Sequence, residues 1–274
     1  MASSVTPKTL KARLNKANEE PLYGLFLLSF FPTLAEIAGH AGYDFVVVDM
    51  EHGHGGISEA LPCLQALAAT QTPAILRLLE SFAAWAKKAL DLGPQDIVFP
   101  VINNPELAKK AVSYCRYLPN GVRGVAHPVV RASKYGIDDV KYISSNAICY
   151  SILYMLEWMR KRKHRIVESV EAVKNIKEIA TVEGVDCVMM GPFDLSVSMG
   201  WLRDPVNEKV KEVMRVAEKA VLKSDSETYL AGCAMPNDGP DELKRRGYNL
   251  VCGGADVGLF RSAAVDDVKR FKMN

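Results

Sequence analysis

Short apolar runs alternate with segments of helical periodicity along most of this chain. Seven runs rich in β-branched and aromatic residues predict strands, at residues 23–30, 45–49, 74–78, 97–102, 187–190, 229–235 and 250–253. Segments whose apolar residues recur every three to four positions predict helices, at residues 33–41, 58–69, 83–92, 105–117, 170–179, 207–222 and 238–246. Strands that alternate with helices are typical of a parallel sheet joined by crossover helices.

The same pattern predicts how the strands close. Runs such as FVVVD and IVFPVI are apolar at consecutive positions, which indicates strands buried on both faces. An eighth strand is expected between residues 136 and 169, the least regular part of the chain. Eight strands predict an α/β fold of the (β/α)8 TIM-barrel type, and 274 residues suit one such domain. No GxGxxG follows the first strand, which argues against a Rossmann fold.

The two ends of the chain differ in character. Residues 1–20 are polar, and we expect them to form a flexible segment ahead of a single barrel domain over residues 21–274. Residues 259–272 predict a final helix with an apolar stripe. That stripe must pack either on the barrel wall or on a neighbouring subunit.

Composition narrows the classes of partner. The net charge is only +2, from 34 basic and 32 acidic residues, so neither nucleic acid nor an anionic membrane is an expected partner. No apolar run is long enough to span a membrane. The six cysteines show no CxxC pair and predict buried thiols of a reducing compartment. A cytoplasmic protein is therefore expected, with a plastid or other organelle as the alternative suggested by the basic, Ser-rich N-terminus.

Charged residues follow the second and third apolar runs, at the ends where barrel enzymes carry their catalytic groups. Asp49 and His52 form a dyad in one interpretation, with the carboxylate orienting an imidazole that transfers protons. In the other, His52 lies in a solvated loop. Arg77 either forms a salt bridge with Glu80 or Glu51, or points into the barrel mouth to hold a carboxylate or enolate oxygen.

Asp194 follows the sixth run and also has two interpretations. It either caps the next helix or binds a metal ion. A metal site needs a second oxygen ligand, and Glu168 is available from the preceding strand. Two carboxylates with water suit Mg²⁺ or Mn²⁺ better than zinc. None of the seven clear strands carries the buried lysine that a Schiff-base aldolase requires.

Four segments together resemble the HpcH/HpaI aldolase family, and their sequences are most similar to those of plant members. They are FVVVDMEHG at 45–53, PAILRL at 73–78, VRGVAHPVVRASKYG at 122–136 and EGVDCVMMGPFDLSVSMG at 183–200. The similarity extends over nearly the whole chain, from Tyr23 to Lys272. This family contains metal-dependent 2-keto acid aldolases, such as 2,4-dihydroxyhept-2-ene-1,7-dioate aldolase and 5-keto-4-deoxy-D-glucarate aldolase.

The resemblance implies a barrel of the phosphoenolpyruvate/pyruvate type. It also implies a dimer-based homo-oligomer, often a hexamer, in which the last helix packs on a partner subunit. The implied roles are acid/base catalysis by His52 with Asp49, enolate stabilisation by Arg77, binding of Mg²⁺ or Mn²⁺ by Glu168 and Asp194, and contact of the Gly191 and Pro192 backbone with the substrate carboxylate.

The fifth strand departs from the family pattern. The family ends this strand in Gln-x-Glu-[Ser/Thr], whereas this chain has Ile166-Val167-Glu168-Ser169 after a basic run at 160–165. Residues near 147–161 resemble an insertion. The spacing from Glu168 to Asp194 matches the family without a gap, so we predict a strand over 162–167, an extruded segment over 147–161, and Glu168 as the ligand. The alternative is a strand over 148–156 that ends in Glu157.

These features predict a carbon–carbon lyase. It would cleave or form a bond in a 4-hydroxy-2-keto acid, with pyruvate or a related 2-keto acid and an aldehyde as products. Two alternatives stay open: a citrate-lyase-like enzyme acting on acyl-CoA, and a non-catalytic relative retained as a subunit of an assembly.

Overall fold

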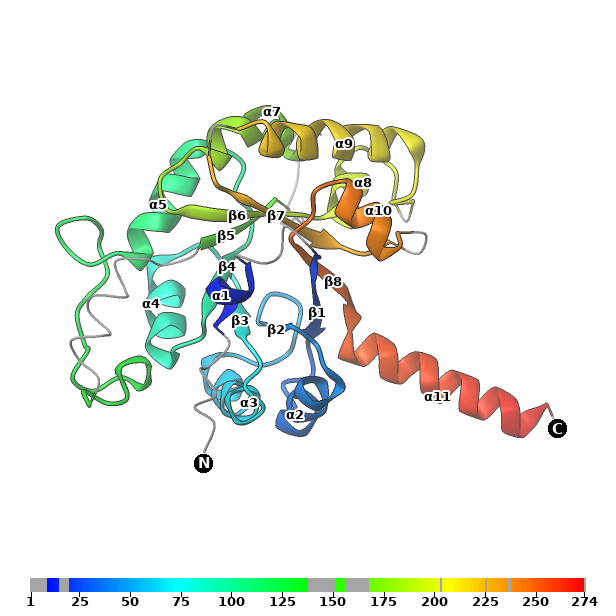
Figure 1. The fold of residues 1–274 in the computed structure, drawn as a ribbon, viewed down its shortest axis with the longest axis horizontal. Helices are drawn as coiled ribbons and strands as arrows, with labels where there is room; N and C mark the ends of the chain where they lie inside the picture. Colours follow the sequence, from blue (N-terminus) through cyan, green and yellow to red (C-terminus); the bar gives the residue numbers. More distant parts are fainter. Residues whose placement is uncertain are drawn as a thin grey trace.

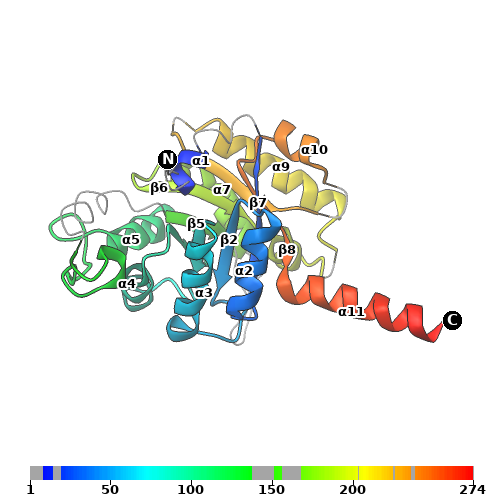
Figure 2. The ribbon, with the colours of Figure 1, turned by 60° about the horizontal axis from the view of Figure 1, so that its bottom comes forward.

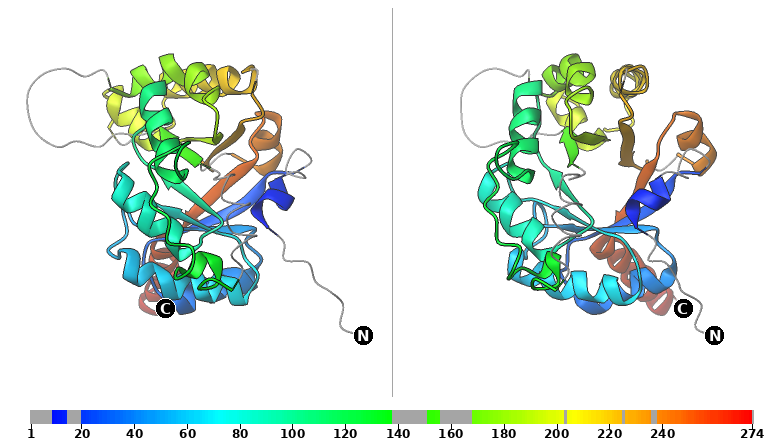
Figure 3. Two further views of the ribbon diagram at one scale, coloured as in Figure 1. Left: turned by 90° about the vertical axis from the view of Figure 1, so that its left-hand side faces the viewer. Right: turned by 60° about the vertical axis from the view of Figure 1, so that its left-hand side comes forward.

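The structure is a computed structural model that describes residues 9–14, 20–137, 151–155, 168–202, 204–224, 226–235 and 238–273. Eight parallel strands form a closed barrel in sequence order, β1 through β8, and helices surround it (Figures 1 and 3). The expected (β/α)8 architecture is therefore confirmed.

The strands are short and pair with their sequence neighbours, and β1 also pairs with β8. Their bounds are β1 Leu22–Leu27, β2 Phe45–Asp49, β3 Ala74–Arg77, β4 Asp96–Phe99, β5 Ser151–Met155, β6 Val185–Met190, β7 Tyr229–Cys233 and β8 Leu250–Ala255. The helices and one 3-10 turn are α1 Leu10–Leu14, α2 Pro32–Ala41, α3 Ile57–Ala69, α4 Ala83–Leu92, α5 Pro105–Cys115, η1 Arg131–Ser133, α7 Glu168–Ala180, α8 Pro192–Ser198, α9 Glu208–Leu222, α10 Pro240–Arg245 and α11 Asp256–Lys272.

Alternation along the strands divides the apolar residues between two cores. Phe45 and Val47 of β2 point into the barrel with Ile75 of β3, whereas Val46 and Val48 pack outward against the helices. Successive side chains of a strand point to opposite faces. The same parity therefore carries Asp49 and Arg77 to the inner side of the barrel, at its carboxyl end.

The fifth strand differs from the prediction. Residues 151–155 form β5 and pair with β4 and β6, so they occupy the fifth position of the barrel and the expectation that 147–161 is an extruded segment is wrong there. The alternative strand over 148–156 overlaps the observed strand, and the expected strand over 162–167 lies outside the described residues. SILYM is apolar enough for the barrel interior, whereas the basic run at 160–165 would place unpaired charges there. Residues 138–150 and 156–167, with most of the expected insertion, the basic run and Glu157, lie outside the described residues.

The amino-terminal opening of the barrel is covered by α1, part of the segment expected to be flexible. Leu10 and Leu14 are each 3% exposed and join the cluster of side chains inside the barrel. The Leu10 amide donates to Gln95, and Arg13 forms an ion pair with Asp44 at 3.1 Å. Residues 10–14 thus pack as a plug against this opening of the barrel.

Helix α11 projects away from the barrel (Figures 1 and 2). Its first residue, Asp256, is buried, but many of its apolar side chains are exposed: Val257, Leu259, Phe260, Val265, Val268 and Phe271. In the described part of the chain, these side chains therefore do not pack on the barrel wall.

The remaining expectations about the chain concern its thiols and membranes. Five cysteines in the described part form no disulfide, and Cys63, Cys115, Cys187 and Cys252 are buried, as expected. Cys149 lies outside the described residues. Among the described residues, no helix combines the length and apolar character needed to cross a membrane.

Candidate active site

Asp49 and Arg77 meet at the carboxyl end of the barrel. They are register partners on β2 and β3. Arg77 donates from Nε to Oδ1 of Asp49 at 2.7 Å and from Nη2 to Oδ2, so the pair is bidentate. The two side chains are 4% and 1% exposed. A charged pair this deeply buried is stable only because the fork of the guanidinium matches the carboxylate.

Two further contacts fix the guanidinium of Arg77. Its Nη1 atom lies 3.0 Å from Oε2 of Glu51, which confirms one of the two salt bridges considered for it. Its plane lies over the ring of Phe26, with 4.9 Å between the guanidinium carbon and the ring centroid. Arg77 is thus held at the inner wall of the barrel, at its carboxyl end.

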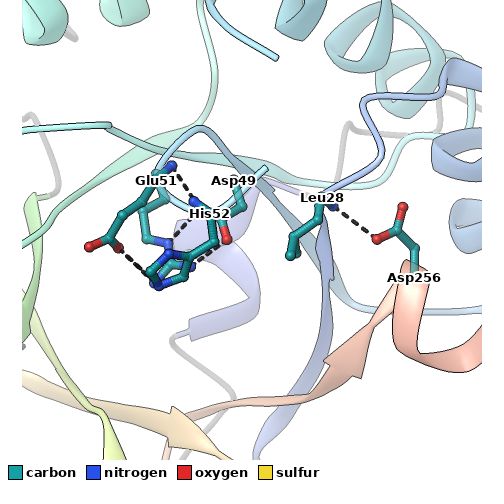
Figure 4. Close-up of polar contacts among 6 residues, drawn as sticks. Leu28, Asp49, Glu51, His52 and Asp256 are labelled. Atoms are coloured by element: carbon teal, nitrogen blue, oxygen red, sulfur yellow. Dashed lines mark hydrogen bonds and ion pairs between the residues drawn. The ribbon is translucent and has the colours of Figure 1, made fainter. Parts of the chain in front are cut away.

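The turn after β2 places Glu51 and His52. Oδ1 of Asp49 accepts from the backbone N–H groups of Glu51, at 3.0 Å, and His52, at 3.3 Å. Gly53 lies so close to the backbone of Leu28 and Asp49 that a Cβ atom there would be 2.4 Å from the Asp49 carbonyl oxygen. The glycine of the HGHGG sequence is therefore needed for the tight turn that presents His52 (Figure 4).

Among the described contacts of Asp49, none joins its carboxylate to the ring of His52, so the expected dyad is not formed. The carboxylate of Asp49 accepts from the backbone N–H of His52 and from the guanidinium of Arg77, and not from the His52 ring. The carboxylate that faces the imidazole is that of Glu51, with 3.9 Å between Oε2 and Nε2. Half of the His52 side chain is exposed, so its ring is accessible from solvent, as a group that exchanges protons with a ligand must be.

Asp194 lies in the first turn of α8, behind Gly191 and Pro192. The helix N-cap is Gly191, so Asp194 is not the cap that one interpretation of the sequence suggested. Burial raises the pKa of Asp194, while the positive charges of His52 and Arg77 partly oppose that rise. These shared interactions bring Asp194 into the same site as the residues that follow β2 and β3.

Glu51 has the same electrostatic character. Burial raises its pKa, Arg77 and His52 lower it, and the charges of Asp49 and Asp194 raise it further. Three carboxyl groups therefore share one guanidinium in a partly desolvated site. Such a site has unbalanced negative charge, which a cation can neutralise.

The fit of a divalent metal depends on these carboxyl groups. In the described part of the chain, no lysine or arginine forms an ion pair with Asp194, and its oxygens are the donors that Mg²⁺ and Mn²⁺ prefer. The described residues contain no cluster of three or more metal-ligating side chains. Glu168 is the first residue of α7, and its side chain lies outside the description, so its role stays a prediction.

A further buried carboxylate, that of Asp256, also shapes this end of the barrel. Asp256, at the start of α11, accepts from the backbone N–H groups of Leu28 and Ser29 at 2.9 and 3.2 Å (Figure 4). It joins the end of β8 to the end of β1. Its position directly after the eighth apolar run was the available signal, but its partners, more than 220 residues away, could not be seen.

Comparison with known proteins agrees with this site. The sequence pattern described as HpcH/HpaI aldolase/citrate lyase matches residues 22–263. The chain belongs to this family. It is 33% identical to the 2-keto-3-deoxy-L-rhamnonate aldolase of Escherichia coli O9:H4 (strain HS), over 96% of this chain and 92% of that protein.

Two further similarities support the assignment. A hydroxypyruvate/pyruvate aldolase from Delftia acidovorans is 32% identical over 96% of this chain and 91% of its own. The crystal structure of an HpcH/HpaI aldolase/citrate lyase family protein from Burkholderia cenocepacia J2315 superposes with a TM-score of 0.84 at 30% identity, covering 97% of this chain and all of that one. The expected family and the expected carbon–carbon lyase class are both confirmed.

Proposed function

We propose that this protein is a metal-dependent aldolase that cleaves a 4-hydroxy-2-keto acid to pyruvate, or a related 2-keto acid, and an aldehyde. The observation that carries the proposal is the placement of His52, Arg77 and Asp194 around one barrel mouth. The aldolase activities of the relatives support it, since both act on 2-keto acids by name.

Retro-aldol cleavage assigns a task to each group. His52 removes the proton of the C4 hydroxyl, the C3–C4 bond breaks, and the bonding electrons move to the C2 keto oxygen as an enolate. Arg77 stabilises the negative charge on that oxygen. Protonation of C3 then gives the 2-keto acid, and the aldehyde leaves. The reverse sequence forms the bond.

The substrate carboxylate is assigned to the start of α8. The backbone around Gly191 and Pro192 leads into a helix N-terminus, where unpaired N–H groups and the helix dipole favour an anion. Asp194 and Glu168 are the residues that would hold Mg²⁺ or Mn²⁺. A metal ion held there would supply Lewis-acid polarisation of the keto group.

The test is a screen for pyruvate release from 4-hydroxy-2-keto acids with several aldehyde halves. Chelation should abolish activity, and Mg²⁺ or Mn²⁺ should restore it. Covalent trapping of pyruvate on a lysine by borohydride would contradict the metal-dependent mechanism. Saturable turnover of CoA esters would instead indicate a citrate-lyase-like enzyme, and inactivity with every substrate would indicate a non-catalytic relative.

We also propose that α11 packs on a second copy of this chain. Phe260 and Phe271 are 73% and 86% exposed on a helix that leaves its own barrel. Water-exposed aromatic side chains repeated along one helix are costly unless a partner covers them. Light scattering should show an oligomer for the wild type and smaller species for Phe260→Asp combined with Phe271→Asp. An unchanged mass would contradict the assignment.

A further inference from the structure

Glu51 lies between the two side chains that act on the substrate in the proposed function. Its Oε2 atom is 3.0 Å from Nη1 of Arg77 and 3.9 Å from Nε2 of His52. Its side chain is only 16% exposed. Figure 4 shows the Glu51 carboxylate and the His52 ring turned toward one another.

Asp49 is not available to orient the imidazole. Its two oxygens accept from Nε and Nη2 of Arg77 and from the backbone nitrogens of Glu51 and His52. Asp49 therefore shapes the turn and holds the arginine. It leaves the ring of His52 to another group.

Oε2 of Glu51 can still accept a hydrogen bond, although it forms an ion pair with Arg77. It is buried, and it accepts no hydrogen bond from the described residues, because its approach to Arg77 lacks hydrogen-bond geometry. A buried acceptor without a donor costs about 1–3 kcal/mol, so a nearby N–H group is favoured to satisfy it. The closest ring nitrogen, Nε2 of His52, is 3.9 Å away. Contacts of this kind are often long before substrate binds and shorten in the complex.

We propose that Glu51 is the positioning residue for the imidazole of His52, and that it also links this ring to the guanidinium of Arg77. This inference rests on the proposed function. A carboxylate that accepts from Nε2 fixes the tautomer and leaves Nδ1 to accept the proton of the substrate hydroxyl. Asp49 and Glu51 then bind different nitrogen atoms of the Arg77 guanidinium. Through Glu51, the positions of the His52 ring and of the Arg77 guanidinium depend on each other.

The kinetic test compares Glu51→Ala and Glu51→Gln with Glu59→Gln. Glu59 is an exposed carboxylate on α3 that accepts from the Gly56 amide, which glutamine also can do. Glu51→Ala should lower kcat by about 10- to 100-fold, part of the usual acid/base contribution, with KM changed by less than about threefold. Glu51→Gln should lose less, because its amide oxygen still accepts from Nε2. Glu59→Gln should behave as the wild type.

A double-variant cycle separates positioning from a structural role. In a His52→Ala background, Glu51→Ala should have no further effect on kcat, because residues that act as a unit are not additive. An equal loss of activity in both backgrounds would overturn the inference. So would a rise in KM at unchanged kcat, or a loss of melting temperature that accounts for the lost activity.

A structural comparison decides the inference without any activity. In crystal structures of the wild type and of Glu51→Ala, the His52 ring should be ordered toward residue 51 only when glutamate is present, while Arg77 stays on Asp49. A ring that keeps its orientation without the carboxylate would sink the positioning role. If the wild type cleaves no hydroxy-keto acid, the proposed function fails, and this comparison still tests the role of Glu51.

Discussion

Asp49 and Arg77 are register partners on adjacent strands, and their side chains form a bidentate ion pair inside the barrel mouth. The pair joins the first two strands that carry site residues. It also explains why two charged groups at the ends of apolar runs can be buried, since each satisfies the other.

Breaking this pair should destabilise the fold. In Asp49→Ala, Arg77 loses its bidentate carboxylate partner, and the turn after β2 loses the acceptor of two backbone N–H groups. Removing one partner of a buried pair costs about 3–5 kcal/mol in the free energy of unfolding. Urea denaturation measures the loss. Glu208→Gln, in an exposed pair with Lys211, should leave the midpoint unchanged, and similar midpoints for both variants would contradict the importance of the buried pair.

His52 should matter for turnover and not for folding. Its ring is half exposed and has no hydrogen-bonded partner within the described part of the chain. His52→Ala should lower kcat at least about 10²-fold, the usual size of an acid/base contribution, without changing the melting temperature. His40→Ala, on an exposed position of α2, is the matched control. Near-wild-type turnover of His52→Ala would refute the assigned role.

The plug at the amino-terminal opening should contribute to stability. Leu14→Ala removes a side chain that is 3% exposed and packs with the interior cluster. Replacing a buried leucine with alanine costs about 2–5 kcal/mol. Thermal or urea unfolding monitored by fluorescence provides the measurement. Leu202→Ala, at a residue 69% exposed, should shift stability by less than about 0.5 kcal/mol. Equal shifts would mean that α1 does not dock on the barrel in solution.

Three buried thiols should be unreactive and should make stability fall in alkaline solution. Burial raises the pKa of Cys63 to about 11, with a smaller contribution from Asp256, and burial raises the pKa of Cys187 and Cys252 well above the ordinary value. The native protein therefore keeps protons that the unfolded chain loses near pH 8.5. The stabilising contribution of Cys63 is complete below that pH and is lost as the pH rises toward 11.

Labelling tests the same thiols directly, because the thiolate is the reactive form. At pH 8, iodoacetamide followed by peptide mass spectrometry should modify these three cysteines only after denaturation. Cys233, which is partly exposed, is the internal control for labelling of the folded protein. Rapid modification of Cys252 in the folded protein would show that the barrel interior opens.

Much of the fold could be predicted from the sequence. The seven clear runs all overlap observed strands, because both faces of a barrel strand are buried and the apolar signal is therefore continuous. The fifth strand could not be placed from the spacing between Glu168 and Asp194, because the apolar character of residues 151–155 decides its position. The sequence SILYM of β5 is uncharged, as a buried barrel strand requires, whereas residues 162–167 include Lys163 and Arg165.

The site followed the same division. The sequence by itself determined which charged residues end the strands, since period-2 alternation and strand order place Asp49, Arg77 and Asp194 at one rim of a barrel. Only the tertiary structure decided how they are paired. The register of β2 with β3 gave Asp49 to Arg77, and the tight turn at Gly53 brought Glu51 to the imidazole of His52. The Asp49–Arg77 pair joins segments that are 28 residues apart, and the Glu51–His52 contact depends on the shape of one turn. The linear pattern contains neither the distance between the segments nor the shape of the turn.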